Sequence, residues 1–251
     1  MIDTRIEDGI AIVTVSHGKA NALDIELCNT LATSFIVLRN SDIKAVVLTG
    51  KGGMFSAGVD LKRLSAEGAG YVTKFLPVLH KLYEAVFFHP KPVIAAINGH
   101  AIAGGAVLAA CADRRVMARG AGRIGVTELQ VGVPFPALAF EIVRFAVPAR
   151  YLTEFTLGAA TYGTDAALAQ GWVDEVVEPG DLMTRALDLA RAYGSLSPVA
   201  VAQTKAQIRQ PVADRLAHNG AATDRAVTSI WTAPEALARV QGYVEKTLRK
   251  I

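Results

Sequence analysis

The stretch that most constrains this chain begins at Ile97 and ends at Pro136, and it reads INGHAIAGGAVLAACADRRVMARGAGRIGVTELQVGVPFP. The apolar residues just before it, 93–97, predict a strand, and the Ala-rich run after the glycine-rich turn predicts a helix that opens near Gly104. The first N–H groups of a helix have no partner inside it, and the helix dipole favours negative charge there. Because glycine lets another group come close to those N–H groups, Ala103-Gly104-Gly105 is a candidate donor for an anion or an oxyanion.

The second half of this stretch carries one carboxylate, Glu128, in an otherwise uncharged run over residues 124–140. Val126, Leu129 and Val131 flank it, and apolar neighbours disfavour the charged form of a carboxyl group and so raise its pKa. Such a group is a usable base near neutral pH. The alternative is a glutamate on a surface loop. A lone acid beside an anion-stabilising turn indicates proton transfer at a carbon next to a carbonyl group.

A second turn, FSAGVDL at residues 55–61, has the same character. Small residues at 56–58 let a ligand approach the backbone, and Asp60 can begin a helix as its N-cap. The N–H of Val59 then lies just outside that helix and can point into a cleft, although an ordinary strand–helix turn is the alternative. Together, the two turns could supply two N–H donors, from Val59 and Gly104, to one thioester oxygen.

Strands alternate with helices up to about residue 177, and the chain is helical from about residue 181 onward. This alternation predicts an α/β protein, but it does not choose between a doubly wound sheet and a superhelix of ββα turns. The glycine-rich residues 50–59 and 98–103 are predicted as loops. Strands are predicted over residues 2–6, 10–15, 45–49, 93–97, 114–118, 123–125 and 173–177. Helices are predicted over residues 25–39, from 61, 71–88, 104–112, 136–147, 148–157, 165–170, 181–193, 198–208, 212–230 and 234–248.

The composition favours a large folded core, because 51% of the residues are hydrophobic and 20% are charged. A net charge of +3 without a basic stripe argues against a nucleic-acid partner. Cys28 and Cys111 lie in apolar helical patterns, which predicts buried free thiols and a reducing compartment. The N-terminal residues do not resemble a signal peptide, and the apolar runs are too short to span a bilayer. We therefore expect a cytoplasmic protein with no membrane partner.

Three other chemistries are weakly supported. The spacing Gly120-x-Gly122-x-x-Gly125 matches a dinucleotide fingerprint, but the residues after it do not predict the helix that this motif must open. Ser56 lies in Phe-Ser-Ala-Gly, which is not the Gly-x-Ser-x-Gly pattern of a nucleophile elbow. The five histidines are scattered and form no metal-ligand pattern, so no metal site is expected.

Four segments together resemble the crotonase (enoyl-CoA hydratase/isomerase) superfamily: HGKANALD, FSAGVDL, INGHAIAGGAVLAACADRRV and TELQVGVPFP. They occur in the order and spacing of that family, and the resemblance covers about residues 5–250. It implies a crotonase-like ββα superhelix that binds acyl-CoA over residues 1–195. It also implies a C-terminal helical oligomerisation region over residues 196–251, and a homotrimer or a dimer of trimers.

The same resemblance implies roles for individual residues. The amides of Val59 and Gly104 would hold the thioester oxygen. The CoA thioester would lie along a set of backbone and side-chain groups from three turns: Lys19, Ala20, Asn21, Ala22, Ala57, Gly58, Asp60, Leu61, Lys62 and Gly105. Lys62 could reach a phosphate as a point charge. No cofactor beyond the CoA moiety of the substrate is implied.

One departure from the hydratases bears on the reaction. They use two glutamates, one of which falls three residues after the middle glycine, where this chain has Val107, while the other is matched by Glu128. Hydration needs water to be activated while a proton reaches C2, whereas moving a double bond from C3 to C2 needs one group. The chain therefore looks most like a single-glutamate Δ3,Δ2-enoyl-CoA isomerase. An enoyl-CoA hydratase, or another crotonase-type reaction, and a non-catalytic acyl-CoA-binding protein are the alternatives.

Overall fold

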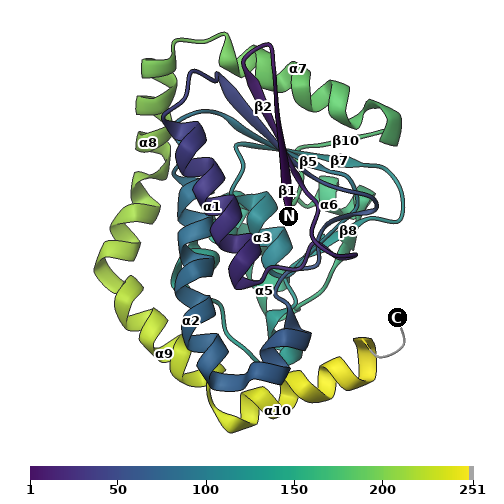
Figure 1. The fold of residues 1–251 in the computed structure, drawn as a ribbon, viewed down its shortest axis with the longest axis vertical. Coiled ribbons are helices and arrows are strands. Elements are labelled where there is room, and N and C mark those ends of the chain that lie inside the picture. The colour runs from purple at the N-terminus through teal and green to yellow at the C-terminus, as the bar shows by residue number, and fades with distance from the viewer. Residues whose placement is uncertain (249–251) are drawn as a thin grey trace.

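Two β-sheets and their covering helices form the fold (Figure 1), in a computed structural model that describes residues 1–248. The larger sheet has the order β1-β2-β3-β5-β7-β10, and the smaller has the order β4-β6-β8-β9. The larger sheet comprises β1 Ile2–Glu7, β2 Ile10–Val15, β3 Ala45–Gly50, β5 Val93–Ile97, β7 Arg114–Ala118 and β10 Glu175–Val177. The smaller comprises β4 Met54–Ser56, β6 His100–Ile102, β8 Arg123–Gly125 and β9 Tyr162–Gly163.

The chain alternates between the two sheets, which produces the predicted spiral. One strand enters the large sheet, the next enters the small sheet, and a helix returns the chain to the start: β3, β4 and α2 (Leu61–Phe87), then β5, β6 and α3 (Gly104–Ala110). This arrangement decides between the two architectures left open by the alternation of strands and helices. The prediction of loops over 50–59 and 98–103 was wrong in part, because β4 and β6 lie there. Three-residue strands form through pairing with distant neighbours and have too short a pattern to be detected locally.

The remaining helices cover the large sheet and extend from it. They are α1 Ile25–Arg39, α4 Ala137–Ala146, α5 Leu152–Leu157, α6 Thr164–Ala169, α7 Leu182–Gly194, α8 Pro198–Arg215, α9 Ala221–Trp231 and α10 Pro234–Tyr243. Three short 3₁₀ turns are η1 Glu128–Val131, η2 Ala149–Tyr151 and η3 Pro179–Asp181, and two π-helical turns are η4 Leu216–Gly220 and η5 Val244–Leu248. No helix within residues 1–248 has the length and apolarity needed to cross a bilayer.

Side-chain caps begin the two helices that border the candidate site. The Asp24 carboxylate accepts from the Leu27 N–H at 2.7 Å and starts α1, and Asp60 accepts from the Arg63 N–H at 3.0 Å and starts α2. Helix α2 bends at Gly68, whose φ of +67° is accessible to glycine at little cost. The two helices predicted from residue 61 and over 71–88 are therefore the two arms of α2.

Both faces of the large sheet are buried along β2, β3, β5 and β7, whereas β1 at its edge is largely exposed. Along β3, Val46 and Leu48 point into the main core with α1 and α2, while Ala45 and Val47 pack with α7 on the opposite face. A parallel sheet covered on both faces carries nearly continuous apolar strands, as these sequences do. Both cysteines are buried as free thiols, as predicted.

The helices after α7 form an arm that runs along one side of the molecule and turns beneath α2 (Figure 1). The predicted helices over 198–208 and 212–230 left a break around Pro211, but α8 continues through it to Arg215. A proline inside a helix costs about 3 kcal/mol. The packing of buried Val212 and the ion pair of Arg215 with Glu141 at 2.6 Å fix the next turn in the helical conformation.

The predicted boundary between the core and the C-terminal region falls in the turn between α7 and α8, at residues 195–197. The oligomerisation role assigned to residues 196–251 stays a prediction. Residues 249–251 of that region lie outside the described part of the chain.

Candidate active site

Three segments meet at one edge of the small sheet. Residues 57–60 follow β4, residues 103–105 follow β6, and Glu128 comes three residues after β8. These three strands are parallel, with Ser56 paired to Ala101 and Ala101 paired to Ile124. Because the carboxyl ends of parallel strands lie at the same edge of a sheet, the two candidate donor turns and the candidate base gather there.

The turn after β4 presents the N–H of Val59. Leu23 pairs with Val59 in a parallel bridge, in which the Leu23 N–H donates to Gly58 O at 2.8 Å and the Asp60 N–H donates to Leu23 O at 3.0 Å. Successive N–H groups of an extended chain point in opposite directions, so the Val59 N–H points away from Leu23. It donates to no acceptor within residues 1–248.

The turn after β6 presents the N–H of Gly104, the first residue of α3. This N–H also donates to no acceptor in the described structure, as expected at a helix start. Ala103 precedes it with φ +49° and ψ −123°, a conformation that a residue with a Cβ rarely adopts. The Ala103 carbonyl accepts from the N–H groups of Ala106 at 2.8 Å and Val107 at 3.1 Å, which holds the turn in place.

The two turns touch, and the close packing around them requires glycine at three positions. A Cβ on Gly58 would lie 2.9 Å from Gly104 N, and a Cβ on Gly105 would lie 2.2 Å from Ser56 O. A Cβ on Gly104 would lie 2.8 Å from the Tyr83 hydroxyl. Backbone therefore packs directly on backbone at this edge, which brings the free N–H groups of the two turns into one small region.

Glu128 begins the turn η1 and is buried. Its Oε2 atom has no hydrogen-bond partner. Burial raises the pKa of Glu128 to about 7, against the smaller opposing effect of the N–H groups of Glu128 and Thr127. The raised pKa follows the sequence prediction, with one correction: Val126 and Val131 are buried, but Leu129 is 39% exposed because the 3₁₀ turn directs it outward.

The predicted CoA-binding loop packs against the first donor turn. The Ala57 N–H donates to Ala20 O at 3.0 Å, and the Asn21 side-chain amide donates to Met54 O at 2.8 Å. The Ser56 hydroxyl donates to Asn21 O at 2.8 Å, which gives this serine a structural role and leaves it buried. Because its side chain holds the loop, Asn21 would shape the CoA site through the backbone, and Ala22 follows it in the same loop.

The charged and flanking residues of the predicted CoA site differ in exposure. Lys19 and Lys62 are exposed, and Leu61 is partly buried. The Asp60 carboxylate is used in capping α2. Arg63, which sequence reasoning missed, joins the starts of α1 and α2 through hydrogen bonds to Glu26 and, at 2.6 Å, to Glu67.

Val107, on the first turn of α3, is fully buried. Residues 1–248 bury three carboxylates, and two of them have partners: Asp24 caps α1, and Glu141 pairs with Arg144 and Arg215. The third is Glu128. The arrangement therefore offers one buried base and two backbone donors, and residues 1–248 contain no cluster of side chains suited to a metal ion.

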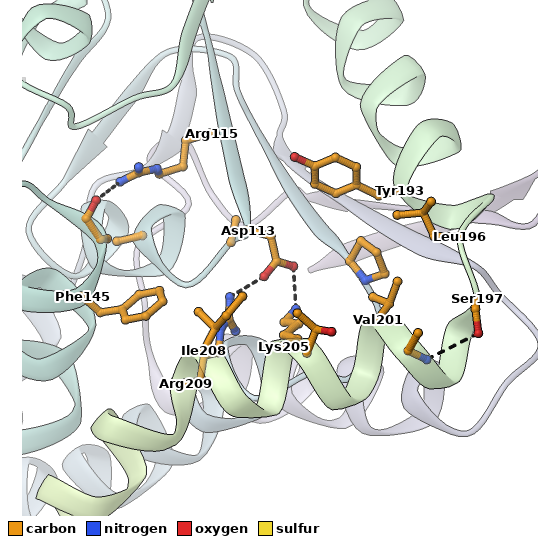
Figure 2. Close-up of a pocket in the computed structure, with 16 residues that line it drawn as sticks. Asp113, Arg115, Phe145, Tyr193, Leu196, Ser197, Val201, Lys205, Ile208 and Arg209 are labelled. Atoms are coloured by element: carbon orange, nitrogen blue, oxygen red, sulfur yellow. Dashed lines mark hydrogen bonds and ion pairs between the residues drawn. The ribbon is translucent and has the colours of Figure 1, made fainter.

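A hollow in another part of the fold lacks this chemistry. It encloses about 620 Å³ between α8 and the large sheet, beside Pro92 and Asp113, which precede β5 and β7. It is thus at the amino ends of the strands. Figure 2 shows Asp113 between Lys205 and Arg209, with contacts of 2.6 Å to each. The carboxylate is fully engaged there, so this hollow offers no free base.

Comparison with known proteins identifies the family. A model of the enoyl-CoA hydratase/isomerase family matches residues 5–250. The chain belongs to this family. Carnitinyl-CoA dehydratase of Salmonella paratyphi B is 30% identical over 241 residues, which are 93% of this chain and 91% of that protein.

Solved structures agree with the family assignment. An enoyl-CoA hydratase from Mycobacterium marinum is 27% identical, with a TM-score of 0.78 over 91% of this chain and 96% of that one. Human mitochondrial Δ3-Δ2-enoyl-CoA isomerase has a TM-score of 0.93 at 24% identity, over 99% of this chain and 98% of that one, a likeness that concerns the fold. The fold is that of the crotonases, and the family acts on acyl-CoA substrates.

Proposed function

We propose that this family member is a Δ3,Δ2-enoyl-CoA isomerase that uses Glu128 as its single acid–base group. The observation that carries the proposal is the pairing of one buried carboxylate, unpartnered at Oε2, with the apolar Val107 where a second acid would be needed for hydration. The Val59 and Gly104 N–H groups would hold the thioester oxygen. The CoA thioester would lie along Lys19–Ala22, Ala57–Gly58, Asp60–Lys62 and Gly105.

The reaction moves one proton. The Glu128 carboxylate takes a proton from C2 of a 3-enoyl thioester. The C2–H electron pair forms a C1=C2 bond, and the C=O π pair moves onto the thioester oxygen. The two N–H donors stabilise this dienolate, which is the step at which fixed backbone dipoles contribute most. Protonated Glu128 then delivers the proton to C4. The C3=C4 electron pair takes up this proton, the C1=C2 pair becomes the C2=C3 bond, and the thioester C=O bond forms again. A pKa of about 7 suits both transfers, because the same group must first accept and then release the proton.

Enoyl-CoA hydration is the second candidate. It is favoured by the names of relatives, which include a hydratase and a dehydratase. Against it stands the position of Val107, fully buried in α3 beside the oxyanion turn. Hydration would require a water to be held and activated by Glu128 alone.

The deciding experiment is a mass-spectrometric assay in D₂O with a 3-enoyl-CoA. We expect the 2-enoyl isomer, with deuterium at C2 or C4 and no added water. Glu128→Gln should lose this activity by at least a hundredfold, since the amide cannot accept the proton. The matched control is Glu84→Gln, which makes the same chemical change on the exposed face of α2 and should keep full activity.

Three other outcomes would contradict the proposal. Unlabelled 3-enoyl-CoA together with rapid hydration of a 2-enoyl-CoA control would favour the hydratase. Tight thioester binding without any exchange of C2 protons would favour an acyl-CoA-binding protein without turnover. Isomerisation that persists unchanged in Glu128→Gln would assign the base to another group.

We further propose a homotrimer or a dimer of trimers in a reducing compartment such as the cytoplasm. Support for assembly comes from large apolar side chains exposed along α8 and before it, namely Leu196, Val199 and Ile208. The two free, buried thiols suit reducing conditions. Light scattering coupled to size-exclusion chromatography measures the mass, and a monomer of 26.5 kDa would contradict the assembly.

A further inference from the structure

Tyr83 lies in direct contact with the second donor turn. It comes from the second arm of α2, is fully buried, and donates its hydroxyl hydrogen to Gly104 O at 2.9 Å. The same hydroxyl occupies the space that a Cβ on Gly104 would need. Burial raises the pKa of Tyr83 well above its ordinary value, with smaller contributions from Cys111, Cys28 and Glu128. The phenol therefore stays a hydrogen-bond donor at any working pH.

The peptide that carries the Gly104 N–H is held in a strained orientation. Ala103 has φ +49° and ψ −123°. Rotating the plane of the Ala103–Gly104 peptide by half a turn would bring ψ of Ala103 to about +57°. That angle lies in the left-handed helical region, which an alanine occupies at lower cost. That rotation would swing the Gly104 N–H away from the Val59 N–H. The residue on the far side of the peptide, Gly104, would permit it, because glycine adopts almost any φ.

Two hydrogen bonds oppose the rotation directly, and a third holds the neighbouring peptide on the Gly104 side. Two are accepted by the Ala103 carbonyl, from the N–H groups of Ala106 and Val107, and they belong to the first turn of α3. The third comes from Tyr83 and holds the carbonyl of Gly104 itself. The bond from Tyr83 is the one among the three that comes from outside the turn. It restrains Gly104, whose φ would have to change in the rotation.

We propose that Tyr83 is a positioning residue that locks the Ala103–Gly104 peptide with its N–H directed at the substrate oxygen. This inference rests on the proposed oxyanion role of Gly104. Tyr83 touches neither the reacting carbons nor Glu128 in this scheme. It keeps a strained backbone in the orientation that the developing dienolate requires, so its effect should appear in the transition state more than in substrate binding.

The test is Tyr83→Phe, which removes the hydroxyl and keeps the ring. We expect kcat for 3-enoyl-CoA isomerisation to fall at least tenfold, with KM changed less than twofold. The matched control is Tyr71→Phe on the same helix, because the Tyr71 hydroxyl is also buried but donates to no acceptor within residues 1–248. Circular dichroism and the melting temperature confirm that both variants fold.

A second variant separates positioning from a general loss of stability. Ala103→Gly removes the strain that drives the rotation, since φ +49° and ψ −123° is an ordinary conformation for glycine. In that background, adding Tyr83→Phe should lower kcat less than threefold. Equal losses in the two backgrounds would mean that the hydroxyl does not act through the Ala103–Gly104 peptide, and a loss no larger than that of Tyr71→Phe would remove the role altogether.

A spectroscopic readout keeps this inference distinct from the proposed reaction. Hexanoyl-CoA labelled with ¹³C at the thioester carbon can be neither isomerised nor hydrated. Its carbonyl stretch, measured by infrared difference spectroscopy, should shift to lower frequency when bound to the native protein, and the shift should shrink in Tyr83→Phe but not in Tyr71→Phe. A normal shift in Tyr83→Phe overturns the positioning role. Absence of isomerisation by the native protein, with the shift intact, overturns the proposed reaction alone.

Discussion

At the scale of single residues, burial decides what Glu128 can do. An exposed glutamate is a weak base that is ionised at neutral pH, whereas this one is removed from water and leaves Oε2 without a partner. Burial therefore raises the pKa of Glu128 to about 7. The same side chain is thus suited to catalysis and unfavourable for stability, because its charged form is desolvated in the folded protein.

The first prediction concerns the pH dependence of activity. The base must be ionised to take the C2 proton, so kcat/KM for 3-enoyl-CoA should rise with pH, with a midpoint near 7, and level off above it. Initial rates between pH 5 and 9 measure the profile. A midpoint near 4.5, the ordinary value for glutamate, would show that Glu128 is solvated in the working enzyme.

The second prediction concerns stability. Between about pH 4.5 and 7 the folded protein keeps a proton on Glu128 that the unfolded chain has lost, so this residue makes stability fall as pH rises through that window. Glu128→Gln removes the dependence. At pH 8 it should stabilise the protein by about 3 kcal/mol, since a tenfold change in proton affinity corresponds to about 1.4 kcal/mol. Urea unfolding at pH 4 and pH 8 provides the measurement, and an equal effect at both would contradict it.

At the scale of elements, the small sheet brings the site together. The strands β4, β6 and β8 are each three residues long, yet each ends at a functional segment: a donor turn, a second donor turn, or the base. Their parallel pairing aligns those ends, and the close contact of Gly58 with Gly104 joins the two donor turns. The first turn of α3, which follows the second donor turn, carries the buried apolar Val107.

The third prediction tests this element directly. Val107→Glu places a second carboxylate on α3, and we expect hydration of a 2-enoyl-CoA to rise at least tenfold over the native protein while isomerisation falls. Burying a second carboxyl group without a partner should also lower the free energy of unfolding by a few kcal/mol, on the order of 2–4. Val107→Leu is the control for changed packing. Rapid hydration already present in the native protein would show that the apolar residue does not select the reaction.

At the scale of the whole molecule, one carboxylate fixes the C-terminal arm to the sheet. Asp113 lies between α3 and β7, and it binds Lys205 and Arg209 of α8 as well as the N–H of Val93 at the start of β5. Burial lowers the pKa of Lys205 to about 8, although Asp113 opposes this. The arm then passes through α9 to α10, which packs on α2 and on the turn that carries Glu128.

The fourth prediction follows from this arrangement. Asp113→Asn leaves two buried cations without a counter-charge, and it should lower the free energy of unfolding by about 3–5 kcal/mol. Asp188→Asn is the matched control: it removes an exposed carboxylate that pairs with Arg191 at 3.4 Å, and it should cost less than about 1 kcal/mol. Urea denaturation compares the two variants. Similar small effects would show that other contacts hold the arm.

Much of this protein can be read from local sequence. The caps at Asp24 and Asp60, the helix that opens at Gly104 and the raised pKa of Glu128 depend on residues within a few positions of one another, and the structure agrees with each. The α/β class and the crotonase resemblance were likewise available from the chain alone. These features were accessible because helix capping, strand patterning and the apolar neighbours of a carboxylate act over short stretches of chain.

The tertiary structure decided the rest, because it depends on contacts between distant residues. The strands β4 and β6 form through pairing across the small sheet, and α8 continues through Pro211 because of its packing. Tyr83 looks like any aromatic residue on an apolar helix face until α2 places its hydroxyl on Gly104, 21 positions away. The sequence by itself determined which groups are present and how each begins its local element. Only the packing of two sheets and α2 determined that these groups meet at one edge, since the energy of those contacts is realised only in the folded chain.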